Sequence, residues 1–169
     1  IENDLIVDVG TTDEILKKYD LNKYTIIDAA NKAVLPGFID SHTHLIFGGY
    51  RADEFSWRLR GDTYMSIMER GGGITSSVRS TRETTLEEFI ELGKKRLDKF
   101  MAMGVTTVEG KSGYGLDRET ELRQLEAMKE LNKIHPIDVI STFLGPHSVL
   151  PKYKGKEDEF IDYMIDVMK

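Results

Sequence analysis

The fold is decided by residues 105–144, where Val105-Thr106-Thr107-Val108 and Val139-Ile140-Ser141-Thr142-Phe143-Leu144 flank a helical pattern. The first run is rich in β-branched residues, and the second does not alternate between apolar and polar residues, which is typical of strands in a parallel sheet. Asp117 is positioned to cap the helix that lies between the two runs. Two strands joined by one helix predict a right-handed βαβ unit.

The same order of elements continues toward the N-terminus. Apolar residues from Leu86 onward recur at steps of three and four, overlapping capping boxes begin at Thr84 and Thr85, and Gly104 ends this helix. Residues 38–40 form a further short strand. The sequence therefore predicts an α/β fold, but the pattern alone does not separate a doubly wound sheet from a barrel.

The first 35 residues form a separate region that ends before the turn signal Pro36-Gly37. Residues 5–9 and 24–28 are apolar runs that predict two short strands. Two short strands cannot bury their apolar faces alone, so we expect them to need partners.

Composition narrows the class of protein. The 169 residues suggest about one domain, and a hydrophobic fraction of 40% is enough for a folded core. No run of about 18 apolar residues occurs, so no membrane span is expected. The net charge of −6 argues against nucleic-acid binding. The chain has no cysteine, which excludes disulfides and cysteine–zinc sites and fits a cytoplasmic protein.

His42 and His44 are the strongest candidate metal ligands. Alternate residues of a strand point to the same face, so both imidazoles are able to bind one ion and would supply half of a tetrahedral zinc shell. A bare His-x-His is more often just a polar pair at a strand end. Here it follows a predicted strand directly, at the end where parallel α/β folds bind ligands.

Residues 36–45, PGFIDSHTHL, resemble the first-strand motif of the amidohydrolase superfamily, and residues 26–37 are similar to the entry of its members into their barrel. The resemblance implies an α/β fold: the N-terminal part of a (β/α)₈ TIM barrel preceded by a piece of a small β-sandwich. It implies a partial β-sandwich domain over 1–35 and the first part of a metal-dependent barrel over 36–169. Because the family's other metal ligands and its acidic proton-transfer residue have no counterpart before Lys169, we expect an internal portion of a longer enzyme.

Four further motifs narrow the resemblance. They resemble a branch of the superfamily that hydrolyses 4-imidazolone-5-propanoate to N-formimidoyl-L-glutamate in histidine degradation. That branch implies a small anionic substrate and one divalent zinc or iron ion in the full-length enzyme. The motifs are FGGYR at 47–51, GGGI at 71–74, KSGYGL at 111–116 and FLGPH at 143–147.

The resemblance also implies a role for five residues. His42 and His44 would bind the metal ion. Arg51 would bind the substrate carboxylate, a task that suits a planar guanidinium. Tyr114 would offer its hydroxyl to the substrate, and His147 would bind the ring and act as a catalytic residue. The plainer interpretations are a solvated loop arginine, a half-buried tyrosine and a histidine bonded to the backbone.

Three other motifs are given no catalytic role. Some amidohydrolases carry a carbamylated lysine that bridges two metals, but Lys111 follows the second barrel strand and is not assigned to metal. No Gly-Lys-Ser/Thr follows Gly71-Gly72-Gly73, so a P-loop is not supported. His135 precedes a proline between helix and strand and is interpreted as structural.

Alternative functions remain open at this point. The chain is also compatible with another cyclic amidohydrolase or a deaminase of the superfamily, with a non-catalytic barrel that only binds, or with a homo-oligomer formed through unpaired strand edges. We expect the 169 residues alone to be inactive, because two histidines cannot complete a metal site.

Overall fold

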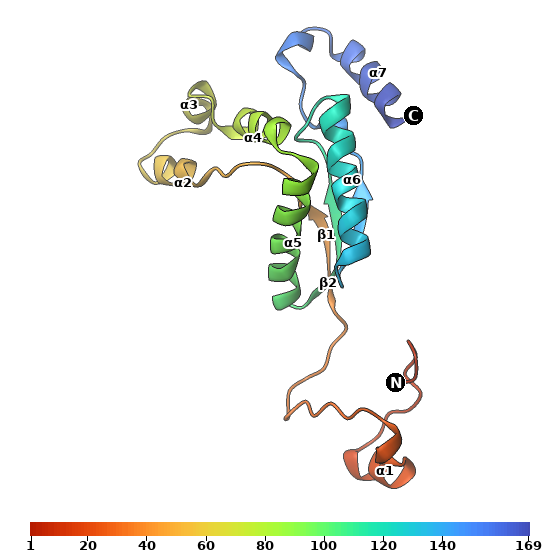
Figure 1. The fold of residues 1–169 in the computed structure, drawn as a ribbon. Helices are drawn as coiled ribbons and strands as arrows, with labels where there is room; N and C mark the ends of the chain where they lie inside the picture. The colour runs from red at the N-terminus through yellow and green to blue at the C-terminus, as the bar shows by residue number, and fades with distance from the viewer. The chain divides into compact units, whose positions relative to one another are not determined.

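A computed structural model describes all 169 residues (Figure 1). Contacts between residues divide the chain into two units, residues 1–36 and 37–169, which are described separately. None of the helices is both long and apolar enough to cross a lipid bilayer.

The first unit contains little regular structure. It consists of α1 (Thr12–Lys18), the 3₁₀ turn η1 (Leu21–Lys23) and an isolated bridge between Glu2 and Leu5. The runs 5–9 and 24–28 are not strands in this structure, which corrects the expectation from their sequence. A strand needs a ladder partner, and this unit supplies none. Most of the large apolar side chains in both runs are exposed. The β-sandwich therefore stays a prediction.

The second unit is built on a sheet of three parallel strands in the order β1-β2-β3. The strands are β1 (Phe38–Thr43), β2 (Val105–Lys111) and β3 (Asp138–Thr142). The register pairs Thr43 with Gly110 and Lys111 with Thr142, so the carboxyl ends of all three strands meet at one edge. The predicted α/β fold with parallel strands is confirmed. Strand β3 ends at Thr142, two residues earlier than its apolar run predicts.

Helices α5 (Leu86–Ala102) and α6 (Arg118–Ile134) connect the strands and lie side by side along the sheet (Figure 1). A capping box between Thr85 and Glu88 begins α5, and the Asp117 carboxylate caps α6. These helices and the sheet enclose the main core. Its fully buried large side chains are Leu45, Ile46, Phe89, Leu97, Met128, Leu131 and Ile137.

Gly93 lets α5 approach α6 closely. A Cβ at this position would lie 2.4 Å from Cδ1 of Leu131 and 2.8 Å from Cδ1 of Ile46. No side chain fits there, because carbon atoms in contact are normally about 3.5–4.0 Å apart. The opposite face of the sheet carries no helix, and on it Ile39 and Ile140 are 71% and 56% exposed.

The connection from β1 to α5 contains three helices: α2 (Ala52–Leu59), α3 (Tyr64–Glu69) and α4 (Gly73–Glu83). After β3 come the 3₁₀ turns η2 (Gly145–His147) and η3 (Pro151–Tyr153) and helix α7 (Glu157–Met168). Helix α7 and neighbouring loops form a second, smaller core with Val78 of α4.

Candidate functional site

Three rings gather at the carboxyl edge of the sheet, one after each strand. His44 follows β1, Tyr114 follows β2, and His147 lies in η2 after β3. The ring centroids of His44 and His147 are 4.6 Å apart in a stacked arrangement, and those of His44 and Tyr114 are also 4.6 Å apart. The centroids of Tyr114 and His147 are 5.4 Å apart. The parallel register thus brings together side chains that are about seventy and thirty residues apart in the sequence.

His42 lies beside this group of rings. The centroids of His42 and His44 are 6.0 Å apart, a separation that one ion bonded at about 2.0–2.1 Å to a nitrogen of each ring is able to span. Nδ1 of His44 is buried and has no hydrogen-bond partner. Burial, together with the nearby His147, His42 and Lys111, lowers the pKa of His44 to about 4. A neutral imidazole with a free nitrogen is the form that binds metal.

The histidine pair alone would not complete a metal site. No group of three or more His, Cys, Asp or Glu side chains in the chain is arranged to hold an ion. The two imidazoles therefore fit the expected zinc or iron ion as two ligands of an incomplete set.

The segment that follows His44 is anchored through its backbone. Arg96 of α5 donates hydrogen bonds to the carbonyls of Leu45 and Phe47, at 2.7 and 3.1 Å. Gln124 of α6 donates to the carbonyl of Ile46 at 2.6 Å. The Arg96 guanidinium also lies 3.7 Å from the centroid of the Phe47 ring. Two helices thereby fix the path of the chain between His44 and the pocket described next.

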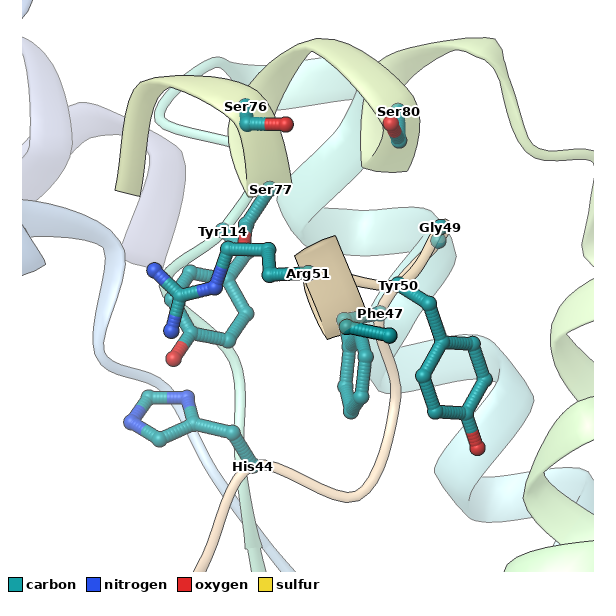
Figure 2. Close-up of a pocket in the computed structure, with 11 residues that line it drawn as sticks. His44, Phe47, Gly49, Tyr50, Arg51, Ser76, Ser77, Ser80 and Tyr114 are labelled. Carbon is teal, nitrogen blue, oxygen red and sulfur yellow. The ribbon is translucent and has the colours of Figure 1, made fainter. Parts of the chain in front are cut away.

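A pocket of about 490 Å³ opens beside His44, and Figure 2 shows the side chains that line it. His44, Arg51 and Tyr114 all line it, and the Arg51 side chain is drawn toward the other two, whereas the Tyr50 ring points away (Figure 2). Serines of α4 form a further part of the wall. They are Ser76, Ser77 and Ser80.

Buried Glu54 connects two walls of the pocket. Its Oε1 accepts a hydrogen bond of 2.7 Å from the N–H of Gly73, the first residue of α4. Its Oε2 lies 4.0 Å from Nε of Arg51. Glu54 belongs to α2, so this carboxylate holds the start of α4, which carries the pocket serines, close to Arg51.

Gly113 connects the tyrosine loop to His147. Its φ of +112° is open to glycine almost alone, and a Cβ would lie 2.7 Å from the carbonyl oxygen of Leu144 and 2.8 Å from Cβ of His147. The carbonyl oxygen of Gly113 lies 3.1 Å from Nδ1 of His147. Only glycine lets the two loops approach this closely.

The residues expected at the site are therefore neighbours, although the pocket does not include all of them. His42 and His147 adjoin His44 but do not line the pocket. The roles assigned to all five residues stay predictions. Sequence reasoning missed the serines of α4, although Ser76 and Ser80 are four residues apart and so share one helix face.

The two residues given no catalytic role, Lys111 and His135, each have polar partners of their own. Nζ of Lys111 lies 2.5 Å from Oε1 of Glu109, which also accepts a hydrogen bond of 2.7 Å from Thr142. The partners Lys111 and Thr142 lower the pKa of Glu109. His135 is buried, and its Nδ1 accepts a hydrogen bond from the N–H of Ile137 at 3.1 Å, in keeping with a structural residue.

Comparison with models of protein families identifies a similarity to one class of enzymes. A family model described as "Amidohydrolase family" matches residues 25–73, which include β1, the histidine pair and Arg51. A parallel α/β unit with two histidines at the end of its first strand agrees with that match.

Comparison with individual proteins narrows the similarity to one enzyme of that family. The chain is 59% identical to an imidazolonepropionase of Parabacteroides distasonis over 162 residues, 96% of this chain and 39% of that protein. It is 56% identical to the imidazolonepropionase of Clostridium tetani over 98% of this chain and 40% of that protein. An imidazolonepropionase of Bacillus cereus is 49% identical over 99% of this chain and 39% of its own length. The chain is a homologue of the imidazolonepropionases and spans about 40% of their length.

Proposed function

We propose that the chain is part of an imidazolonepropionase, which opens the ring of 4-imidazolone-5-propanoate with water to give N-formimidoyl-L-glutamate in the cytoplasm. The observation that carries this proposal is the identity of 49 to 59% with imidazolonepropionases over 96 to 99% of the chain. The pocket supports it, because a guanidinium, a phenol and a half-buried imidazole line one cavity.

The substrate's two ends suit different parts of the site. Arg51 binds the propanoate carboxylate through paired hydrogen bonds, as guanidinium groups do. The Tyr114 hydroxyl donates a hydrogen bond to the substrate, and His147 holds the imidazolone ring through its own ring nitrogen. These contacts orient the ring so that its carbonyl faces the His42–His44 pair.

His42 and His44 are proposed as metal ligands. A zinc or iron ion, when bound, would supply hydroxide from water near neutral pH. His42 and His44 would hold the ion through ring nitrogens, and the low pKa of His44 keeps its own ring neutral. The remaining ligands and the group that transfers the proton come from other parts of a longer polypeptide.

The fold assignment follows the same homology. We propose that residues 36–169 form the first part of a (β/α)₈ barrel with its first three strands, and that the pocket lies at the carboxyl ends of the strands, where barrel enzymes carry their active sites. Residues 1–35 are proposed as a piece of the small β-sandwich.

The experiment tests Arg51 in a full-length polypeptide that contains this chain. Arg51→Met should raise KM for imidazolone propanoate by about 10-fold to 100-fold, because a charge-assisted bidentate contact is lost. Arg51→Lys should recover only part of the loss. Arg58→Met is the matched control, because Arg58 is an exposed arginine of α2 outside the pocket.

Two outcomes would contradict the proposal. One is faster turnover of hydantoin or guanine than of imidazolone propanoate by the unmodified polypeptide, which would favour another cyclic amidohydrolase or a deaminase. The other is an equal KM for the Arg51→Met and Arg58→Met variants, which would remove Arg51 from the substrate site.

A further inference from the structure

We infer that Glu121 is a positioning residue that fixes Tyr114 and His147 in the pocket, an inference that rests on the function proposed above. Glu121 lies in the first turn of α6, and its side chain is fully buried, with an exposed fraction of 0%. It does not line the pocket. Any effect on the substrate therefore acts through other residues.

The Glu121 carboxylate binds the backbone of the loop that carries Tyr114, residues 113–116. Oε2 accepts a hydrogen bond of 2.9 Å from the N–H of Gly113. Oε1 accepts hydrogen bonds of 2.8 Å from the N–H groups of Gly115 and Leu116. These three donors surround Tyr114 on both sides in the sequence, so one carboxylate determines the path of the segment that carries the tyrosine.

The conformation of the loop explains why an anchor is needed. Gly113 has a φ of +112° and Leu116 a φ of +56°, which is unfavourable for a leucine. Backbone in such regions persists only where its surroundings hold it in place. Hydrogen bonds to an ionised carboxylate are stronger than neutral ones, and here they all act on the strained segment.

The Glu121 carboxylate also influences the position of His147, because Gly113 contacts both residues. Glu121 holds the N–H of Gly113, and the carbonyl oxygen of Gly113 lies 3.1 Å from Nδ1 of His147. No Lys, Arg or His is paired with Glu121 within 4.0 Å, so the loop N–H groups are the partners that compensate its buried charge. A change at Glu121 should thus displace both rings.

The test is the isosteric variant Glu121→Gln in the full-length polypeptide. A glutamine has one carbonyl oxygen, which is able to serve Gly115 and Leu116, but its amide NH₂ then faces the N–H of Gly113. We expect KM for imidazolone propanoate to rise about 10-fold or more, because a buried donor is left unpaired and the rings shift. We expect kcat to change less than KM.

Met128→Ala is the control for a purely structural effect. Met128 is buried in the same helix, in the main core. Its truncation lowers the amount of folded enzyme and hence the apparent kcat, while KM stays the same. If Glu121→Gln behaves like Met128→Ala, with KM unchanged, the inference is overturned.

Amide hydrogen exchange separates this inference from the proposed function. In Glu121→Gln the amide of Gly113 should exchange faster than in Met128→Ala, and equal rates would overturn the inference. If the unmodified polypeptide opens no imidazolone, the proposed function fails. The exchange rates then decide alone: faster exchange at Gly113 supports the role of Glu121, and unchanged exchange refutes it.

Discussion

Single residues at the strand ends decide which side chains meet. His44, Tyr114 and His147 are neighbours because each follows a parallel strand. Gly113 has no side chain, so the loop after β2 is able to approach the loop after β3 closely. The resemblance to the amidohydrolase superfamily implied that these residues share one site, and the common edge of the parallel strands explains why they meet.

Gly113→Ala should lower the free energy of unfolding by about 1–3 kcal/mol, since the added Cβ brings backbone strain and an overpacked contact together. The clash is with the carbonyl oxygen of Leu144 and Cβ of His147. Urea titration of the chain measures the change. Gly155→Ala is the matched control, because Gly155 has a φ of +79° but open space around it. Equal losses in the two variants would show that strain alone matters and that the two loops do not press on one another.

At the scale of elements, local signals were predictable and long-range partners were not. Asp117 and the Thr85–Glu88 box begin helices that sequence alone located. The overlapping box at Thr84 is absent, because Thr84 instead ends α4. The start of α4 depends on Glu54, nineteen residues earlier, and no local pattern predicts such a partner.

The anchors of the candidate site are long-range in the same sense. Arg96 and Gln124 lie about fifty and eighty residues beyond the segment that they hold. In the sequence they are ordinary polar residues of amphipathic helices, so nothing marks them as anchors. The prediction of strands over 5–9 and 24–28 was wrong for a related reason, because a strand exists only where a partner pairs with it.

Gly93→Ala tests the contact between α5 and α6. Alanine is better than glycine in a helix by about 1 kcal/mol, but inserting a methyl group into a tight contact costs about 1–3 kcal/mol. The Cβ of the alanine would lie only 2.4 Å from Cδ1 of Leu131, so we expect a net loss of stability in urea unfolding. Leu131→Val shortens the facing side chain, and in that background Gly93→Ala should cost less. A stabilised single variant would mean that the two helices separate without penalty.

At the scale of the whole molecule, the second unit is an open sheet with one bare face. Strands β1 and β3 each have an unpaired edge, and Ile39 of β1 and Ile140 of β3 are exposed on the bare face. Apolar side chains on an uncovered sheet face normally pack against a further layer or further strands. The open edges agree with the proposal that the barrel continues beyond β3.

The 169 residues alone should hydrolyse no imidazolone propanoate, because two imidazoles do not complete a metal site. Turnover is measured with added zinc or iron, and binding of the metal by calorimetry. A full-length polypeptide assayed alongside serves as the positive control. Hydrolysis by the isolated chain would show that its own residues complete the site, and would contradict the division of ligands proposed above.

The anchoring of residues 45–47 has a consequence for protein engineering. Arg96 and Gln124 grip carbonyl groups, and every amino acid presents the same carbonyl. Leu45 and Ile46 are also fully buried in the main core, so we expect exchanges of these two for apolar side chains of equal volume to leave the neighbouring imidazole in place. Substitution of Arg96 should displace it.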